Sequence, residues 1–176
     1  MSGDVLLVID VQRVYMEPSP MVTRDGDDLI EKCNQLIRKA RADGVPVLFV
    51  RHMDRTSPED EALTGIHPDL NQQASDPVVT KGFGSAFFKT DLEEHLANVE
   101  AKRLVVCGLA TFGCVNATVM CALCKGYDVV VAEDAHGTPQ DTPTPAAEMI
   151  AVFNGIWKGA GAVLRPTAGL VGESPV

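Results

Sequence analysis

The sequence lacks the features that would assign it to several large classes of protein. It has no basic excess, because 15 Lys and Arg residues stand against 24 Asp and Glu, a net charge of −9. Nucleic acid and anionic membrane surfaces are therefore poor partners. No apolar run approaches the roughly 20 residues that cross a bilayer, and the start of the chain lacks the basic segment of a signal peptide. We expect a cytosolic (cytoplasmic) protein that binds small molecules.

No disulfide framework and no cofactor-binding motif is recognisable either. The five cysteines are odd in number, and three of them fall in one predicted helix, which indicates a reducing compartment. The segment KGFGS follows a predicted strand but matches neither the Walker nor the dinucleotide-binding pattern. Cys121 and Cys124 lie three residues apart with no second pair, so we expect helix packing there, not a zinc or redox site. These absences predict no cofactor.

What the sequence does contain is a regular alternation of apolar runs and amphipathic segments. A chain of 176 residues with 45% hydrophobic and 22% charged residues suits one compact domain over residues 1–176. The alternation predicts an α/β fold, a three-layer α/β/α sandwich whose six-stranded parallel sheet has the Rossmann-like order 3-2-1-4-5-6. The predicted strands span residues 5–9, 45–50, 77–80, 103–107, 128–132 and 162–164, and the predicted helices 26–43, 90–99, 114–125 and 146–157.

Two local signals refine these boundaries. Thr90 with Glu93 three residues later forms a capping-box pattern, which predicts the start of the second helix. Residues 53–75 are polar and carry Pro and Gly without a sustained period, so we expect a long loop with short helical pieces that rims a site.

Three reactive side chains fall where the predicted sheet presents its carboxyl edge. Asp10 closes the first strand, Lys81 closes the third, and Cys114 follows the fourth at the start of a helix. Ligands bind at this edge in doubly wound sheets. A thiolate is the nucleophilic form of cysteine, and a helix start and a nearby Lys favour it. We therefore predict Cys114 as the nucleophile, Asp10 as the base and Lys81 as the electrostatic stabiliser.

The turn before Cys114 is the second candidate feature. Backbone amides at a tight strand-to-helix turn can face a developing oxyanion, so we predict an oxyanion hole formed by Ala110, Thr111 and Cys114. Each residue alone has an ordinary structural explanation, such as a buried inert cysteine or a solvated lysine. Their meeting at one edge is what indicates catalysis.

The segments LLVIDVQRVY, VVTKGFGSAFFKTDL and VVCGLATFGCVNATVMCALCKGYDVVVAEDAHGT resemble the isochorismatase-like cysteine hydrolase superfamily over nearly the whole chain. The resemblance implies the triad Asp10, Lys81 and Cys114, and a cis peptide at Ala110–Thr111. It implies a cysteine hydrolase that cleaves a C–N bond of a small amide, ureide or carbamoyl compound through a thioester, because isochorismatases proper do not rely on this cysteine. It also implies a homo-oligomer, a dimer or a tetramer.

The resemblance also bears on metal binding. Nicotinamidases of this superfamily carry an Asp-x-His metal motif after the second strand, where this chain reads His52-Met53-Asp54. We therefore predict no metal, although His52, His67 and Asp54 leave a chance metal site open. The predicted substrate-binding residues are Gln12, Tyr15, His52, Phe83, Phe87 and Phe112.

Two other functions remain open from the sequence. A catalytically silent family member would bind a ligand or a partner through the same fold, and Gly113 beside the nucleophile is compatible with such a change. A thiol peroxide sensor would need a second cysteine close to Cys114. Val115, Val119 and Ala122 form an apolar stripe that we expect to be exposed and to contact another subunit.

Overall fold

The computed structural model describes residues 3–16, 26–57, 60–139 and 142–172. The elements in chain order are β1 (Asp4–Ile9), α1 (Arg13–Met16), α2 (Gly26–Ala42), β2 (Val47–His52), α3 (Glu61–Thr64), β3 (Val78–Lys81), α4 (Leu92–Asn98), β4 (Arg103–Gly108), a short π-helical turn η1 (Thr111–Val115), α5 (Asn116–Cys124), β5 (Asp128–His136), α6 (Ala146–Gly159), β6 (Val163–Arg165) and α7 (Thr167–Gly172).

The sheet confirms the predicted topology. Its six strands are all parallel and follow the order β3-β2-β1-β4-β5-β6. Central strand β1 has a fully buried run after its first residue, as a strand covered on both faces should. The winding reverses between β1 and β4, so the carboxyl ends of these two strands meet at the switch point, where ligands bind in such sheets.

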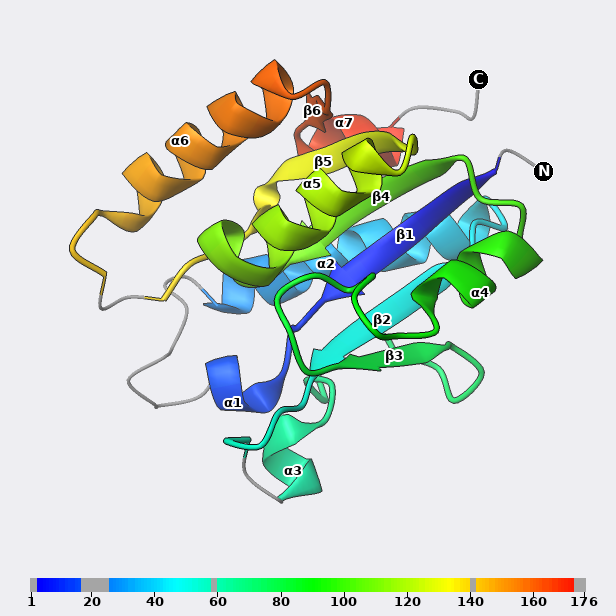
Figure 1. The fold of residues 1–176 in the computed structure, drawn as a ribbon, viewed down its shortest axis with the longest axis horizontal. Helices are drawn as coiled ribbons and strands as arrows, with labels where there is room; N and C mark the ends of the chain where they lie inside the picture. Colours follow the sequence, from blue (N-terminus) through cyan, green and yellow to red (C-terminus); the bar gives the residue numbers. More distant parts are fainter. Residues whose placement is uncertain (1–2, 17–25, 58–59, 140–141, 173–176) are drawn as a thin grey trace.

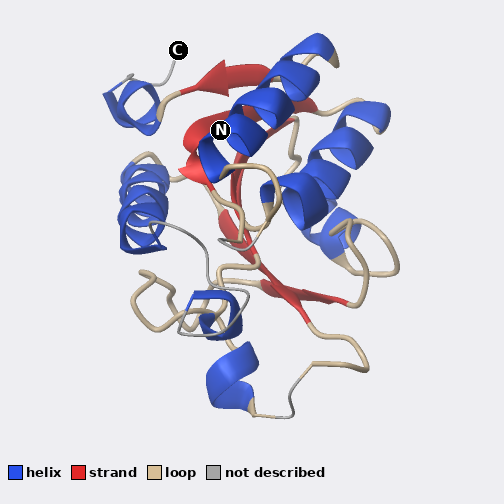
Figure 2. Ribbon diagram, turned by 90° about the vertical axis from the view of Figure 1, so that its left-hand side faces the viewer, coloured by secondary structure: helices blue, strands red, loops and turns tan. Residues whose placement is uncertain are grey.

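Helices cover both faces of the sheet (Figures 1 and 2). Alternate residues of β1 enter two separate cores, because successive side chains of a strand point to opposite faces. Val5, Leu7 and Ile9 pack with residues of α4, α5 and α6, whereas Leu6 and Val8 pack with residues of α2 and α7. The three-layer sandwich is therefore confirmed. None of the helices within the described ranges is long and apolar enough to cross a membrane.

Three sequence-based expectations about local structure are wrong. Asp91, not Thr90, is the N-cap of α4, and the Thr90 hydroxyl donates to the Ala86 carbonyl oxygen at 2.5 Å instead of closing a capping box. The Thr90 side chain is drawn back into the preceding turn. The expected helix over 114–125 begins earlier, as η1, and Gly113 breaks its regularity with φ −105° and ψ −107°.

The third correction concerns the apolar stripe on this helix. Val115, Val119 and Ala122 are fully buried in the core beneath α5, so they cannot contact another subunit. They face the sheet because α5 packs on β5 along this side. Oligomerisation itself stays a prediction.

Candidate active site

The triad predicted from the sequence is assembled around the side chain of Lys81. The Lys81 Nζ lies 2.7 Å from Oδ2 of Asp10 and 3.0 Å from Sγ of Cys114. The Lys81 side chain is 0% exposed and the Asp10 side chain is 3% exposed, so this ion pair is closed off from solvent. Such a pair is stable only with close geometry and further hydrogen bonds.

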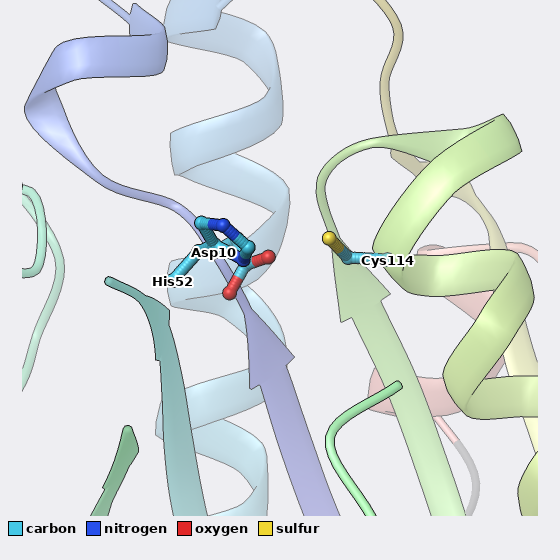
Figure 3. Close-up of side chains that lie close together, drawn as sticks. All are labelled: Asp10, His52 and Cys114. Carbon is cyan, nitrogen blue, oxygen red and sulfur yellow. The ribbon is translucent and has the colours of Figure 1, made fainter. Parts of the chain in front are cut away.

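His52 joins this group, although the sequence suggested only a pocket-lining role. It pairs in register with Lys81 across β2 and β3, which places the two side chains on the same face. The Nδ1 of His52 lies 3.1 Å from Nζ of Lys81. Figure 3 shows Asp10, His52 and Cys114 close together, coming from the ends of β1 and β2 and from η1. We call Asp10, His52, Lys81 and Cys114 the charged cluster.

The backbone around Asp10 is held in an unusual conformation. Asp10 has a φ of 50°, in the left-handed region, where non-glycine residues cost about 1–2 kcal/mol. Its amide donates to the Val50 carbonyl oxygen at 2.9 Å, so β2 fixes the turn. This conformation directs the carboxylate toward Lys81. The second carboxylate oxygen, Oδ1, is buried and has no hydrogen-bond partner among the described residues.

Burial decides the protonation state of the charged cluster. Burial of the Cys114 thiol, followed by the negative charge of Asp10, raises the pKa of Cys114 to about 11, although Lys81 opposes the rise. Burial also raises the pKa of Asp10, and Lys81 offsets part of that rise. The expected thiolate is therefore not the resting form near pH 7. Cys114 also lies in η1, not in the first turn of a regular helix.

The turn between β4 and η1 is anchored at both of its ends. The Leu109 amide donates to the Ile9 carbonyl oxygen and the Thr111 amide to that of Gly137, each at 2.7 Å. The Thr111 amide is thus engaged and cannot bind an oxyanion, which corrects that part of the sequence-based prediction. The cis peptide lies between the two anchors, at Leu109–Ala110, one residue earlier than expected.

A second buried group, which sequence reasoning missed, lies behind this turn. His136 at the end of β5 is 3% exposed. Its Nδ1 lies 3.0 Å from the Thr111 hydroxyl and its Nε2 lies 3.1 Å from Oδ1 of Asn154. Its ring also meets that of Trp157 edge to face, with centroids 4.9 Å apart. We call Thr111, His136, Asn154 and Trp157 the neutral cluster, because burial lowers the pKa of His136 to about 4.

The remaining substrate-binding candidates separate into three groups. Tyr15 lies close enough to the site to feel its charges. Burial, and then the charges of Asp10, Cys114 and Asp54, raise the pKa of Tyr15 to about 12. Gln12 is fully buried, at 0% exposure. Its amide nitrogen donates to the carbonyl oxygens of His52 and Thr64 at 3.1 and 2.5 Å, so it holds neighbouring segments together.

The three phenylalanines differ in position. Phe87 belongs to the core, where its ring stacks on Tyr127 at the amino end of β5, the sheet edge opposite the triad. The substrate role predicted for Phe87 is therefore wrong. Phe83 is 52% exposed and packs edge to face on Phe88. Phe112, two residues before Cys114, is 43% exposed. Substrate contact by Phe83 and Phe112 stays a prediction.

The atoms of Asp10, His52 and Cys114 that face one another suit the Lys81 ammonium better than a resident metal ion. Single ligand atoms of Asp10, His52 and Cys114 lie within 4.8 Å of one another, which is metal-like spacing. However, Nζ of Lys81 lies 2.7–3.1 Å from an atom of each of the three residues. A metal ion in their midst would meet this positive charge. His67 is directed to Asp69, whose amide donates to its Nδ1 at 3.3 Å.

Comparisons with known proteins place the chain in one family. A model of the isochorismatase domain matches residues 4–156. An uncharacterised isochorismatase family protein of Bacillus subtilis is 30% identical over 172 residues, 92% of this chain and 95% of that protein. Nicotinamidase 3 of Arabidopsis thaliana is 30% identical over 151 residues, which cover 76% of this chain and 72% of that protein. The crystal structure of an isochorismatase from Pseudomonas putida superimposes with a TM-score of 0.86 at 28% identity, covering 95% and 89% of the two chains.

Proposed function

The chain belongs to the isochorismatase family, and we propose that it is a cysteine hydrolase that cleaves a C–N bond of a small amide, ureide or carbamoyl compound. The observation that carries this proposal is the contact of one buried ammonium, that of Lys81, with both Asp10 and Cys114. A nucleophile beside a base that is oriented by a third group is the general arrangement for covalent catalysis. A nicotinamidase among the relatives supports a C–N bond of a non-peptide substrate.

The first step begins from a neutral thiol and an ionised Asp10. As Sγ of Cys114 adds to the substrate carbonyl carbon, Asp10 takes the thiol proton on Oδ1, the oxygen without a partner among the described residues. Lys81 remains bonded to Oδ2 of Asp10 and stabilises the partial negative charge on sulfur while the proton leaves. The raised pKa of Cys114 is compatible with this order, because the proton leaves only when the carbon–sulfur bond forms.

The tetrahedral intermediate carries an oxyanion that needs hydrogen-bond donors. The Thr111 amide already donates to Gly137, so the backbone amides of Ala110 and Cys114 take this role. Asp10 then returns its proton to the leaving nitrogen, the C–N bond breaks, and an amine or ammonia departs. Water, with Asp10 again as base, hydrolyses the thioester on Cys114 and releases the acid.

The decisive experiment measures ammonia release from a panel of small amides, ureides and N-carbamoyl compounds with EDTA present. The wild type should release ammonia and Cys114→Ala should not, at an unchanged melting temperature. Cys124→Ala is a matched control, since this cysteine is exposed and lies outside the charged cluster. Equal release by wild type and Cys114→Ala would refute the cysteine mechanism.

A catalytically silent protein that binds a ligand or a partner is the second candidate function. The raised pKa of Cys114 favours it, because a buried neutral thiol is a weak nucleophile at rest. Slow alkylation of Cys114 would not separate the two functions, since both predict it, whereas turnover does. A peroxide sensor is less well supported, because Cys107 is buried in the core and its thiol donates to the Leu7 carbonyl oxygen at 3.7 Å.

A further inference from the structure

The ammonium of Lys81 has three N–H groups, and the charged cluster offers it three acceptors. These are Oδ2 of Asp10 at 2.7 Å, Sγ of Cys114 at 3.0 Å and Nδ1 of His52 at 3.1 Å. An ammonium donates three hydrogen bonds and accepts none. Because the Lys81 side chain is 0% exposed, water does not replace a lost acceptor, and each of the three bonds fixes one direction of the ammonium.

Two of these acceptors change during the proposed reaction, and the third does not. The carboxyl group of Asp10 gains and loses a proton, and the sulfur of Cys114 becomes part of a thioester, in which it is a poor hydrogen-bond acceptor. Only the ring of His52 keeps the same bond to Lys81 throughout the cycle. An ammonium that lost its orientation in a buried site would carry an unsatisfied donor, which is unfavourable because no water replaces the lost acceptor.

The backbone of His52 is fixed by Gln12. The His52 amide donates to Oε1 of Gln12 at 2.6 Å, and Nε2 of Gln12 donates back to the His52 carbonyl oxygen at 3.1 Å. Gln12 lies two residues after Asp10, so the ends of β1 and β2 are joined directly behind the catalytic carboxylate. This pairing holds the His52 ring at a constant distance from Lys81.

The ring itself is oriented by Asp54. Since Lys81 can only donate, Nδ1 of His52 is the acceptor and Nε2 carries the ring proton. That Nε2 lies 3.1 Å from Oδ2 of Asp54. Oδ1 of Asp54 accepts hydrogen bonds from the amide and the hydroxyl of Thr56 at 2.8 and 2.7 Å. These bonds, and that of His52, hold the pKa of Asp54 well below its usual range, so it is ionised.

We propose that His52 and Asp54 are positioning residues that hold the Lys81 ammonium in line with Asp10 and Cys114 through the hydrolytic cycle. This inference rests on the proposed function. It also revises the role expected for His52, because both ring nitrogens are already engaged and the ring contacts the substrate only by giving up one of these bonds. A metal ion at His52 would likewise break its bond to Lys81.

The test uses three variants of the whole 176-residue chain in the ammonia-release assay. His52→Leu removes the acceptor for Lys81 and should lower kcat by about 10²-fold, with KM almost unchanged. His52→Asn places an amide oxygen near the position of Nδ1 and should recover most of kcat. Asp54→Asn keeps a hydrogen-bond acceptor for His52 but loses the charge, so its effect should be smaller, about 3- to 10-fold.

Chemical rescue distinguishes orientation from a merely structural effect. His52→Gly leaves space for a ring, and added imidazole should raise the kcat of this variant by at least about 10-fold. The control is His95→Ala, a surface histidine paired with Asp91, whose activity should not respond to imidazole. Loss of activity in His52→Gly without rescue would overturn the proposal, as would a raised KM at unchanged kcat, which marks a substrate contact.

A readout that needs no turnover separates this inference from the proposed function. The rate of Cys114 alkylation by iodoacetamide, followed at pH 9 by peptide mass spectrometry, reports how well Lys81 stabilises the thiolate. It should fall in His52→Leu and recover in His52→Asn, even if no compound of the panel is hydrolysed. An unchanged rate in His52→Leu would show that His52 does not position Lys81. Activity lost to EDTA and regained with Zn²⁺ would assign His52 to a metal instead.

Discussion

The charged cluster and the neutral cluster lie at the same edge of the sheet, and each contains a histidine that makes two hydrogen bonds. In the charged cluster a full ammonium and carboxylate are buried together, and one carboxylate oxygen has no partner among the described residues. In the neutral cluster both ring nitrogens of His136 face uncharged side chains. The difference is what the proposed function requires, in which one cluster moves a proton and the other holds the turn that carries Ala110.

The largest effect should come from removing the base of the charged cluster. Asp10→Asn fits the left-handed backbone, which Asn tolerates well, and it still accepts a hydrogen bond from Lys81. The amide cannot take the Cys114 proton, so kcat/KM should fall by about 10²- to 10⁴-fold. Asp4→Asn, at the half-buried start of the same strand and far from its carboxyl end, is the control and should keep full activity. If Asp10→Asn were as active as the wild type, Asp10 would not be the base.

The next largest effect, on the free energy of unfolding, should come from Gly108, a residue on which both clusters depend. Gly108 has a φ of 117°, and a Cβ there would lie 2.1 Å from the Ile9 carbonyl oxygen, directly before Asp10. Its own carbonyl oxygen accepts a bond from the Gly137 amide, beside His136. Gly108→Ala should therefore lower the free energy of unfolding by at least about 3 kcal/mol.

A matched variant controls for the backbone conformation at this position. Gly126 also has a positive φ, 87°, but nothing lies within 4 Å of a Cβ built there. Gly126→Ala should therefore cost only about 1–2 kcal/mol in urea unfolding. Similar losses in the two variants would show that the close approach of Gly108 to Ile9 is not limiting.

The contribution of the neutral cluster to stability should depend on pH. His136 has an ordinary pKa near 6.5 when unfolded and one of about 4 when folded, so the unfolded chain binds more protons between these values. Stability should fall as the pH is lowered from 6.5 to 5, by about 1.5 kcal/mol from this residue. Urea midpoints of wild type and His136→Gln, compared at both pH values, measure the difference. An equal slope in the variant would assign the pH dependence to other groups.

The smallest expected effect comes from one hydroxyl of the neutral cluster. Thr111→Val keeps the shape of the side chain but removes the group that bonds Nδ1 of His136. It should cost about 1–2 kcal/mol of stability. It should also lower kcat about 10-fold, because the turn between β4 and η1, whose amides are proposed to bind the oxyanion, becomes looser. Thr167→Val removes a comparable hydroxyl, bonded to Asp134, and should lose stability without losing kcat. A parallel loss of kcat in both variants would argue against a specific role for the turn.

The sequence was most informative where function follows from the position of a residue at the end of a strand. Asp10, Lys81 and Cys114 could be predicted to meet because parallel strands all present their carboxyl ends at one edge. Gln12 and Phe87 could not be placed by the same reasoning, because the direction of a side chain depends on its partners. Gln12 is engaged by the backbone of β2 and α3, and Phe87 by Tyr127.

The order of the sheet and the meeting of Asp10, Lys81 and Cys114 at one edge were determined by the sequence itself, since both follow from the periodicity of apolar residues and from motifs in fixed positions. The resting state of the site was decided only by the tertiary structure. Burial outweighs Lys81 and keeps Cys114 protonated, and packing between strands brings His52 to Lys81 and His136 to Thr111. Desolvation and hydrogen bonding depend on distances between residues far apart in the chain, which no local pattern specifies.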